Sequence, residues 1–133
     1  MLYAVLCYND EKAVSTWTKE EDDACMIWLG RVQDELRSEG RLGPVVRLQN
    51  TTEAKTLRKA NGEHVVFDGP FAETKEQFLG FYVADVDNID EAVEFAKKLA
   101  IANPGLGSYE IRPLRVYLPS ALSSEAMVAE LAE

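Results

Sequence analysis

The side chains best suited to chemistry lie in a short charged segment near the middle of the sequence. Asp68 begins an Asp-Gly turn, and Glu73 and Lys75 follow it closely. A carboxylate can move a proton and an ammonium can hold an anionic group, so together they could support proton transfer next to a carbonyl, or hydrolysis. We therefore take Asp68 and Glu73 as candidate catalytic residues and Lys75 as a candidate anion-binding residue.

Each of these residues also has a structural interpretation. The Asp68 carboxylate could accept backbone N–H groups two residues further on and fix the turn, whereas a catalytic role requires partial burial in a cleft. Glu73, Lys75 and Glu76 could form a solvated charged run. Because carboxylates flank Lys75, a cationic anchor is favoured over a nucleophilic amine. The sequence leaves both interpretations open.

Glu76, Tyr82 and His64 are further candidate ligand-binding residues. The Tyr82 phenol could orient a ligand, although buried tyrosines more commonly pair with a carbonyl. His64 carries the single imidazole of the chain and precedes Asp68 by four residues. On an extended strand the two side chains share a face but lie about 13 Å apart, which is too far for a direct hydrogen bond. His64 therefore also fits an exposed hairpin position.

The two residues directly after Asp68 shape the backbone, and the third packs. Gly69 permits a positive φ, and Pro70 fixes φ at about −65°. We expect Phe71 to pack in the core or in a dimer seam. These residues position chemical groups and do not react themselves.

The composition disfavours several classes of partner and cofactor. With 14 Lys+Arg against 23 Asp+Glu, the formal net charge is −9, which argues against nucleic acid and anionic membranes as partners. Two cysteines, Cys7 and Cys25, and one histidine cannot build the usual zinc site, and no nucleotide-binding glycine motif is present. We expect no metal or cofactor, no signal peptide and no membrane span. Both cysteines are interpreted as small hydrophobic residues in a reducing cytoplasm.

The spacing of apolar residues predicts the elements that position the charged segment. Residues 2–8 form a buried strand. A helix begins near Thr18, because Thr18 and Glu21 have the spacing of a capping box, and it stops at Gly40. The predicted buried stripe of this helix consists of Cys25, Trp28, Leu29, Val32 and Leu36.

A hairpin and a second helix follow. Residues 45–48 form a short strand, and Asn61-Gly62 predict a two-residue turn between strands 55–59 and 63–67. That turn would pair Lys59 with His64 and Leu57 with Val66. The remaining predicted elements are a strand over 79–86, a helix capped by Asn88 and ending at 102, and an extended segment over 109–118. The predicted stripe of the second helix is Ile89, Ala92, Val93, Ala96, Leu99 and Ala100.

This order describes a ferredoxin-like α+β sandwich, a βαβ unit, an added hairpin and a second βαβ unit, with both helices on one face. The other face would expose Phe81 and Val83, together with Tyr3 and Val5 or their alternates. A second copy packed there would close a dimeric α+β barrel. We expect a homodimer, one domain over residues 1–119, and a tail over 120–133 that forms a short helix or frays.

The most specific motif is Asp-Gly-Pro-Phe-x-Glu-x-Lys-Glu from Asp68 to Glu76, followed by Gly80-x-Tyr82. This string resembles the signature of the YCII-related, or DGPF-domain, family, and the order of elements agrees from Met1 to about Pro119. The resemblance implies a dimeric α+β barrel with a cleft near the motif, and a suspected enzymatic activity. Within the motif, Gly80 is implied to be structural.

One feature of the smaller members of that family is missing. They carry a histidine near the start of the first helix, proposed to act with an aspartate that matches Asp68. This chain has no histidine between Ser15 and Asp23, so a His–Asp mechanism lacks its partner here. Genes of the family often neighbour genes of extracytoplasmic-function sigma factors.

Two functional hypotheses result. The first is a small-molecule-binding protein that acts as a cofactor-free enzyme, with Asp68 as base, Lys75 as anion anchor, and Glu73 and Tyr82 as orienting groups. The second is a non-catalytic regulatory or docking module that senses a small ligand or binds a protein such as a sigma factor. The missing histidine and the acidic residues within 20–23 and 85–94 favour the second. A structural dimer without activity is a third alternative.

Overall fold

A four-stranded antiparallel sheet organises the protein. The computed structural model describes residues 1–123, and its sheet has the order β2-β5-β1-β6. The strands are β1 (Leu2–Asn9), β2 (Leu42–Arg47), β5 (Gln77–Asp85) and β6 (Ser108–Pro113). Chain-distant strands are thus neighbours, and the central pair β1–β5 joins the two halves of the sequence.

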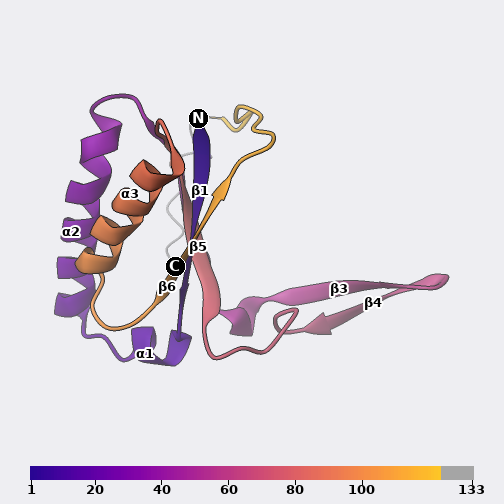
Figure 1. The fold of residues 1–133 in the computed structure, drawn as a ribbon. Helices are drawn as coiled ribbons and strands as arrows, with labels where there is room; N and C mark the ends of the chain where they lie inside the picture. Colours follow the sequence, from indigo (N-terminus) through magenta and orange to yellow (C-terminus); the bar gives the residue numbers. More distant parts are fainter. Residues whose placement is uncertain (124–133) are drawn as a thin grey trace.

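Helices α2 (Lys19–Arg37) and α3 (Ile89–Ala102) cover one face of this sheet (Figure 1). The predicted capping box starts α2: Thr18 Oγ1 accepts from the Glu21 N–H at 3.0 Å, and Glu21 Oε1 accepts from the Thr18 N–H at 3.0 Å. Asn88 caps α3 by accepting from the Glu91 N–H at 3.0 Å. The α+β, ferredoxin-like fold predicted from the sequence is confirmed.

The core lies between the helices and the sheet face that carries Tyr3, Val5 and Tyr82. Phe95 is buried in it, although the sequence prediction omitted that residue, whereas the predicted Ile89 is 45% exposed. Trp28 was predicted to be buried, and this is wrong, because its side chain is 55% exposed. The buried line of α2 consists of Cys25, Leu29 and Val32. Trp28 lies about 100° around the helix from Leu29, where the Arg31 guanidinium sits 5.0 Å from its ring.

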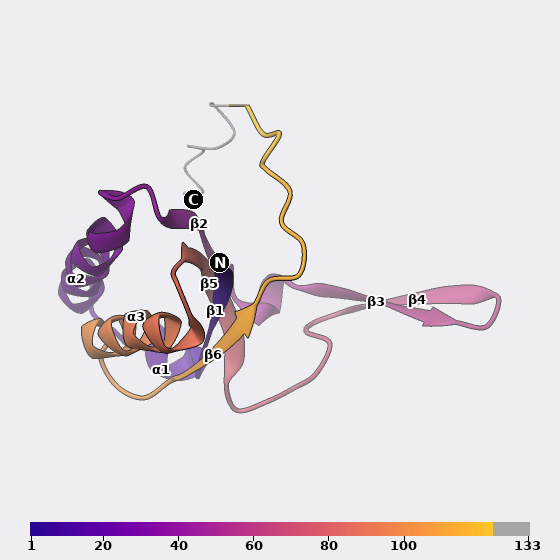
Figure 2. The same cartoon turned by 45° about the horizontal axis from the view of Figure 1, so that its top comes forward.

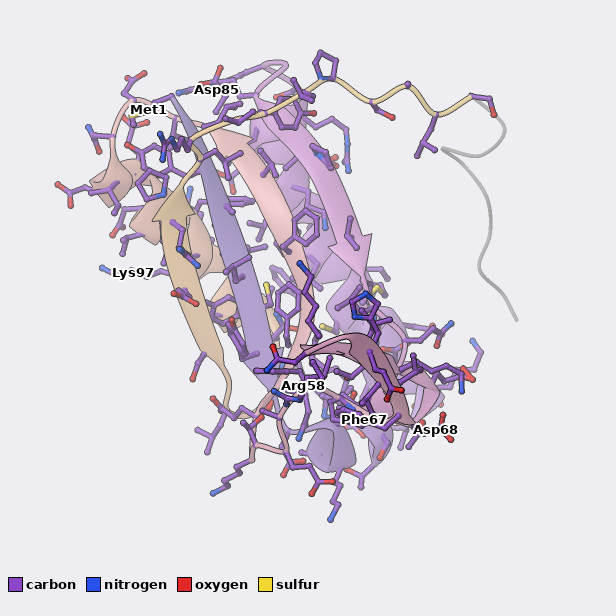
Figure 3. The ribbon with its side chains drawn as sticks, turned by 90° about the vertical axis from the view of Figure 1, so that its right-hand side faces the viewer. Met1, Arg58, Phe67, Asp68, Asp85 and Lys97 are labelled. Atoms are coloured by element: carbon purple, nitrogen blue, oxygen red, sulfur yellow. The ribbon has the colours of Figure 1, made fainter. Side chains whose placement is uncertain are left out.

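The predicted hairpin forms a long arm, residues 55–68, made of β3 (Lys55–Ala60) and β4 (Glu63–Asp68). Gly62 at its turn has φ +79°, and the register pairs Lys59 with His64 and Leu57 with Val66, as predicted. The arm extends away from the sheet on the side opposite the helices (Figures 1 and 2). It starts at the end of the sheet far from Met1 and Asp85 (Figure 3).

Three local features differ from the prediction. A short helix α1 (Glu11–Ser15) follows β1, because Asp10 Oδ1 accepts from the Lys12 N–H at 2.9 Å and starts a turn. A 3₁₀ turn, η1 (Thr51–Glu53), precedes the arm. Strand β6 ends at Pro113 and does not continue to residue 118. Of the tail predicted over residues 120–133 to form a short helix or fray, residues 124–133 lie outside the described residues.

The sheet face opposite the helices, here called the open face, carries a row of aromatic side chains. Tyr8, Phe78 and Phe81 lie on it, with ring centroids 5.5 Å apart for Tyr8–Phe78 and 6.5 Å apart for Phe78–Phe81. Phe78 is 37% exposed. The alternates of Tyr3 and Val5, rather than these two residues, lie on this face. No helix of residues 1–123 has the length and apolar character to cross a membrane.

Candidate functional site

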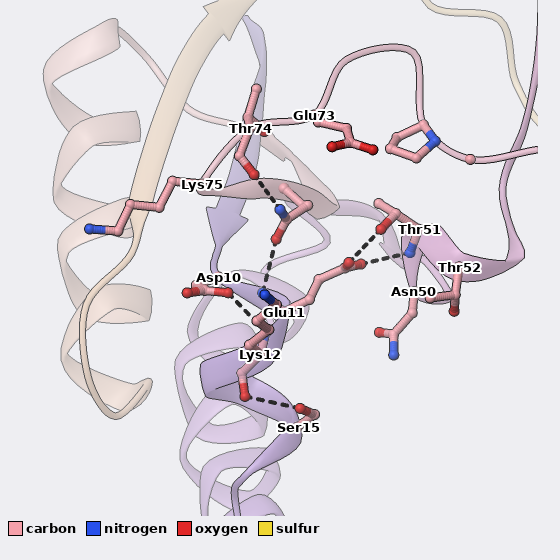
Figure 4. Close-up of a pocket in the computed structure, with 13 residues that line it drawn as sticks. Asp10, Glu11, Lys12, Ser15, Asn50, Thr51, Thr52, Glu73, Thr74 and Lys75 are labelled. Carbon is pink, nitrogen blue, oxygen red and sulfur yellow. Dashed lines mark hydrogen bonds between the residues drawn. The ribbon is translucent and has the colours of Figure 1, made fainter.

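A cavity of about 590 Å³, here called the motif cleft, lies where three segments meet (Figure 4). The first segment is the start of α1, the second is the chain around η1, and the third is the loop from the Asp-Gly turn to β5. The lining residues are Asp10, Glu11, Lys12, Ser15, Asn50, Thr51, Thr52, Gly69, Pro70, Glu73, Thr74, Lys75 and Gln77. The sheet order thus places part of the motif beside the first helical turn of the chain.

Two acidic residues of the cleft hold its walls together. The Glu11 carboxylate accepts from the Thr51 N–H at 2.8 Å and from Thr51 Oγ1 at 2.6 Å. The Glu11 N–H donates to Gln77 Oε1 at 2.9 Å, and Asp10 caps α1. These carboxylates are therefore committed to structure, which the sequence analysis did not foresee.

Three charged side chains of the cleft are exposed and have no ion-pair partner among residues 1–123: Lys12, Glu73 and Lys75. The loop that carries two of them is fixed by Thr74, whose Oγ1 donates to the Glu76 carbonyl at 2.5 Å and whose carbonyl accepts from Gln77 Nε2 at 2.5 Å. In Figure 4 the Lys75 side chain points away from the Glu73 carboxylate. The two motif residues therefore border one cleft without neutralising each other.

Asp68 does not line the motif cleft. Its side chain is 85% exposed, and its carboxylate pairs with Lys55 Nζ at 2.5 Å, across the register of the arm. The partial burial expected for a catalytic Asp68 is absent. The alternative bond to backbone N–H groups is replaced by this cross-strand ion pair, so Asp68 closes the base of the arm.

The other predicted residues around the motif lie in different places. Glu76 accepts from Ser108 Oγ at 2.7 Å, and His64 is exposed on the arm. Phe71 was expected in the core or a seam; within this chain it is 71% exposed, with the Arg58 guanidinium 5.0 Å from its ring, so the core alternative is wrong. Gly69 has φ +108°, which explains a glycine at this turn.

Tyr82 lines a second cavity of about 180 Å³ between the helices and the sheet, here called the Tyr82 cavity. Its ring packs edge-on against Phe95, with centroids 5.8 Å apart and planes at 90°. Burial raises the pKa of Tyr82 to about 12. Gly80 borders the same cavity, and a Cβ at this position would lie 2.2 Å from the Val46 carbonyl oxygen. Close approach of β2 to β5 therefore requires glycine here.

Two further residues, which no motif in the sequence indicated, share this cavity with Tyr82. Cys7 and Tyr109 line it from β1 and β6, and burial raises the pKa of each to about 12. Asn103 Nδ2 donates to Tyr109 Oη at 2.8 Å. Strand alternation could have placed Cys7 on the face of Val5, but only the sheet order places Tyr82 and Tyr109 on either side of β1.

The sequence was also compared with known proteins. A sequence model of the YCII-related domain matches residues 1–116. The chain belongs to the YCII-related family. This member is 58% identical over 124 residues to an uncharacterized protein of Rhizobium meliloti (strain 1021), a match that covers 93% of this chain and all of the relative. Both cavities of the YCII-related protein lie within the matched residues. Among residues 1–123, no group of three or more His, Cys, Asp and Glu side chains is placed to hold a metal ion.

Proposed function

We propose that this YCII-related protein binds a small organic anion in the motif cleft and moves a proton on it without a cofactor. In this proposal Lys75 and Lys12 attract the anionic group, and Glu73 is the general base. Asp68 supports the turn at the base of the arm, so the role of base that the sequence assigned to it moves to Glu73.

The observation that carries the proposal is that some charged side chains of the cleft hold the backbone in place, whereas others make no ion pair within residues 1–123. Asp10 and Glu11 hold backbone groups, whereas Glu73, Lys75 and Lys12 make no ion pair within residues 1–123. Exposed charges without a structural use, gathered around one cleft, are available to a ligand. A carboxylate and two ammonium groups that border one cleft suit a substrate that is anionic and carries an acidic C–H bond.

The chemical step follows from these groups. The Glu73 carboxylate removes a proton from the carbon next to a carbonyl, and the C–H electron pair moves into the enolate. The lysine ammonium groups stabilise the negative charge of the enolate. Glu73 then returns the proton to the same or a neighbouring carbon, so the step needs neither an oxidant nor a metal.

Deuterium exchange tests this proposal directly. Pyruvate is a suitable probe, because it is anionic and its methyl protons lie next to a carbonyl. With the protein in D₂O, proton NMR should show loss of the methyl signal faster than in buffer. Glu73→Gln should lower the protein-dependent rate by about a hundredfold, the usual size of a lost general base.

Two matched variants control this experiment. Glu76→Gln removes a nearby carboxylate that bonds Ser108 outside the cleft, and it should leave the exchange rate unchanged. Lys75→Gln should raise the pyruvate concentration needed for half-maximal rate. Protein-dependent exchange that survives Glu73→Gln contradicts the assignment of the base, and absence of any exchange contradicts proton transfer on α-keto acids.

The second part of the proposal is a homodimer that covers the open face. Its support is the row of Tyr8, Phe78 and Phe81 on a sheet face that no described helix covers, since exposed apolar patches of this kind mark interfaces. Both cysteines are free thiols, which fits a reducing cytoplasm. Native mass spectrometry should give twice the chain mass of 14.8 kDa, and a monomer at micromolar concentration contradicts the dimer.

A docking module remains the second candidate, and the arm is the feature that favours it. Leu57 and Val66 are each 58% exposed there, and an isolated two-stranded sheet is marginally stable in water. A partner protein could cover these side chains. Pull-down at low and high salt tests this function. A partner that contacts the acidic residues within 20–23 and 85–94 is released by salt, whereas a partner that covers only the apolar side chains of the arm stays bound. Recovery of no partner argues against docking.

A further inference from the structure

The Tyr82 cavity is separate from the motif cleft, and the two share no lining residue. It lies between the sheet and the helix layer and is bordered by α1, α2 and strands of both halves of the chain. Its wall is mainly apolar, with Val14, Trp17, Leu29 and Leu79 among its residues. A cavity of about 180 Å³ has the size of one aromatic ring, since an apolar protein cavity of about 150 Å³ accommodates benzene.

The polar groups of the inner wall are neutral. Tyr82, Tyr109 and Cys7 all have a pKa raised to about 12 by burial, so they stay protonated at neutral pH. Tyr109 Oη already accepts from Asn103 Nδ2 at 2.8 Å, which leaves its own O–H to donate. The interior therefore suits an uncharged ring that carries at most a hydrogen-bond acceptor, and it disfavours a charged group.

One residue that lines the cavity, Arg47, carries a positive charge. The Arg47 side chain is 58% exposed, and its Nη2 lies 3.7 Å from Asp22 Oδ1. Its Nη1 donates to Met26 Sδ at 3.8 Å, a weak acceptor. The ion pair with Asp22, the one that Arg47 makes among residues 1–123, is too long for a hydrogen bond. The planar fork of the guanidinium, which fits a carboxylate through two parallel hydrogen bonds, therefore still has donors to offer a ligand.

From the size of the cavity, its mainly apolar lining and this cation, we propose that the Tyr82 cavity binds a small aromatic carboxylate. The ring lies among Val14, Trp17 and Leu29, and the carboxylate pairs with Arg47. Tyr82 and Tyr109 offer O–H groups to a substituent on the ring. This site differs from the motif cleft in residues and in ligand chemistry, so either site can be present without the other.

Tryptophan fluorescence gives a direct readout. Trp17 borders the cavity, whereas Trp28 is exposed on α2 and absent from its lining, so Trp28→Phe leaves a single reporter in place. Titration of this variant with benzoate should change the Trp17 emission saturably, with one benzoate per chain. Arg47→Gln should weaken benzoate binding by about tenfold, the cost of losing a charge-assisted pair.

Two comparisons distinguish binding in the cavity from binding elsewhere on the protein. Benzyl alcohol, with the ring but no charge, should bind equally well with and without Arg47→Gln. Lys75→Gln, in the motif cleft, should leave benzoate affinity unchanged. Methyl NMR signals of Val14 and Leu29 should shift with benzoate, while those of Leu6, outside the cavity, stay in place. The proposal fails if benzoate does not bind, if Arg47→Gln binds it equally well, or if the shifts map to the cleft or the open face.

Discussion

The motif cleft and the Tyr82 cavity lie on either side of α1 and use opposite physical means. The cleft gathers exposed charges such as Glu73 and Lys75, whose fields are screened by water and salt. The cavity gathers buried phenols and a thiol that burial keeps neutral. A ligand of the cleft is therefore selected by charge, and a ligand of the cavity by shape and by few hydrogen bonds.

Thiol reactivity should show the largest difference between the two regions. Because burial raises the pKa of Cys7 from 9.0 to about 12, its thiolate fraction at pH 8 is about a thousandfold below that of an ordinary cysteine. Ser15→Cys places an exposed thiol in the motif cleft for comparison. Iodoacetamide labelling followed by peptide mass spectrometry should modify the introduced thiol of that variant quickly and Cys7 very slowly. Equal rates would remove the distinction between the two environments.

Glycine substitutions should show the next largest effect. Gly80→Ala drives a Cβ against the Val46 carbonyl of β2 and should lower the free energy of unfolding by about 3 kcal/mol. Gly69→Ala, in the cleft, places its Cβ in open space, so its only cost is the strain of an alanine at a φ of +108°. That strain should lower the free energy of unfolding by about 1–2 kcal/mol. Urea unfolding measures both values. A Gly80→Ala variant as stable as the parent means that β2 and β5 are not this close.

Alkaline pH should lower the free energy of unfolding through the two buried phenols of the Tyr82 cavity. Tyr82 and Tyr109 have pKa values raised from 10.0 to about 12, so between these values the unfolded chain releases protons that the folded protein keeps. The part of the stability that these two phenols contribute is therefore fully present below pH 10 and is lost as the pH rises toward 12. Tyr82→Phe should remove roughly 1 kcal/mol of this loss, after allowance for solvent screening. Thermal melts across pH 9–12 should show the change in slope, and Glu73→Gln should leave the slope unaltered.

The smallest effect is expected at Asp68. Its ion pair with Lys55 is exposed, so Asp68→Asn should cost about 0.5 kcal/mol or less in unfolding free energy. It should leave pyruvate exchange at the cleft and benzoate binding at the cavity unchanged. If Asp68→Asn abolishes exchange while the free energy of unfolding is unchanged, the base is Asp68, and the assignment of that role to Glu73 is incorrect.

Local signals in the sequence located most elements of this fold. The Thr18–Glu21 capping box and the Asn61-Gly62 turn act between residues at most three apart, and the structure has both. The prediction failed where burial depends on a second element. Trp28 belongs to the predicted apolar stripe of α2, yet its side chain is 55% exposed, because it borders an open groove between α2 and α3.

The candidate site was predictable in its composition but not in its assembly. Glu73 and Lys75 were recognised from the motif, whereas Lys12 lies far from them in the sequence. Asp68 was singled out because an Asp-Gly turn follows a strand, but its cross-strand neighbour Lys55 determines its surroundings. A charge pattern in the sequence therefore identifies charged side chains that could bind a ligand, but it does not say which of them lie together in the folded protein.

The sequence by itself determined α2, α3, most of the strands, the register of the arm and the family motif, because these depend on neighbouring residues. Only the tertiary structure decided that Cys7, Tyr82 and Tyr109 share one cavity, and that Lys12 faces the same cleft as Glu73. Both arrangements depend on the strand order β2-β5-β1-β6. Hydrogen bonding between strands distant in sequence sets that order, and no local preference encodes it.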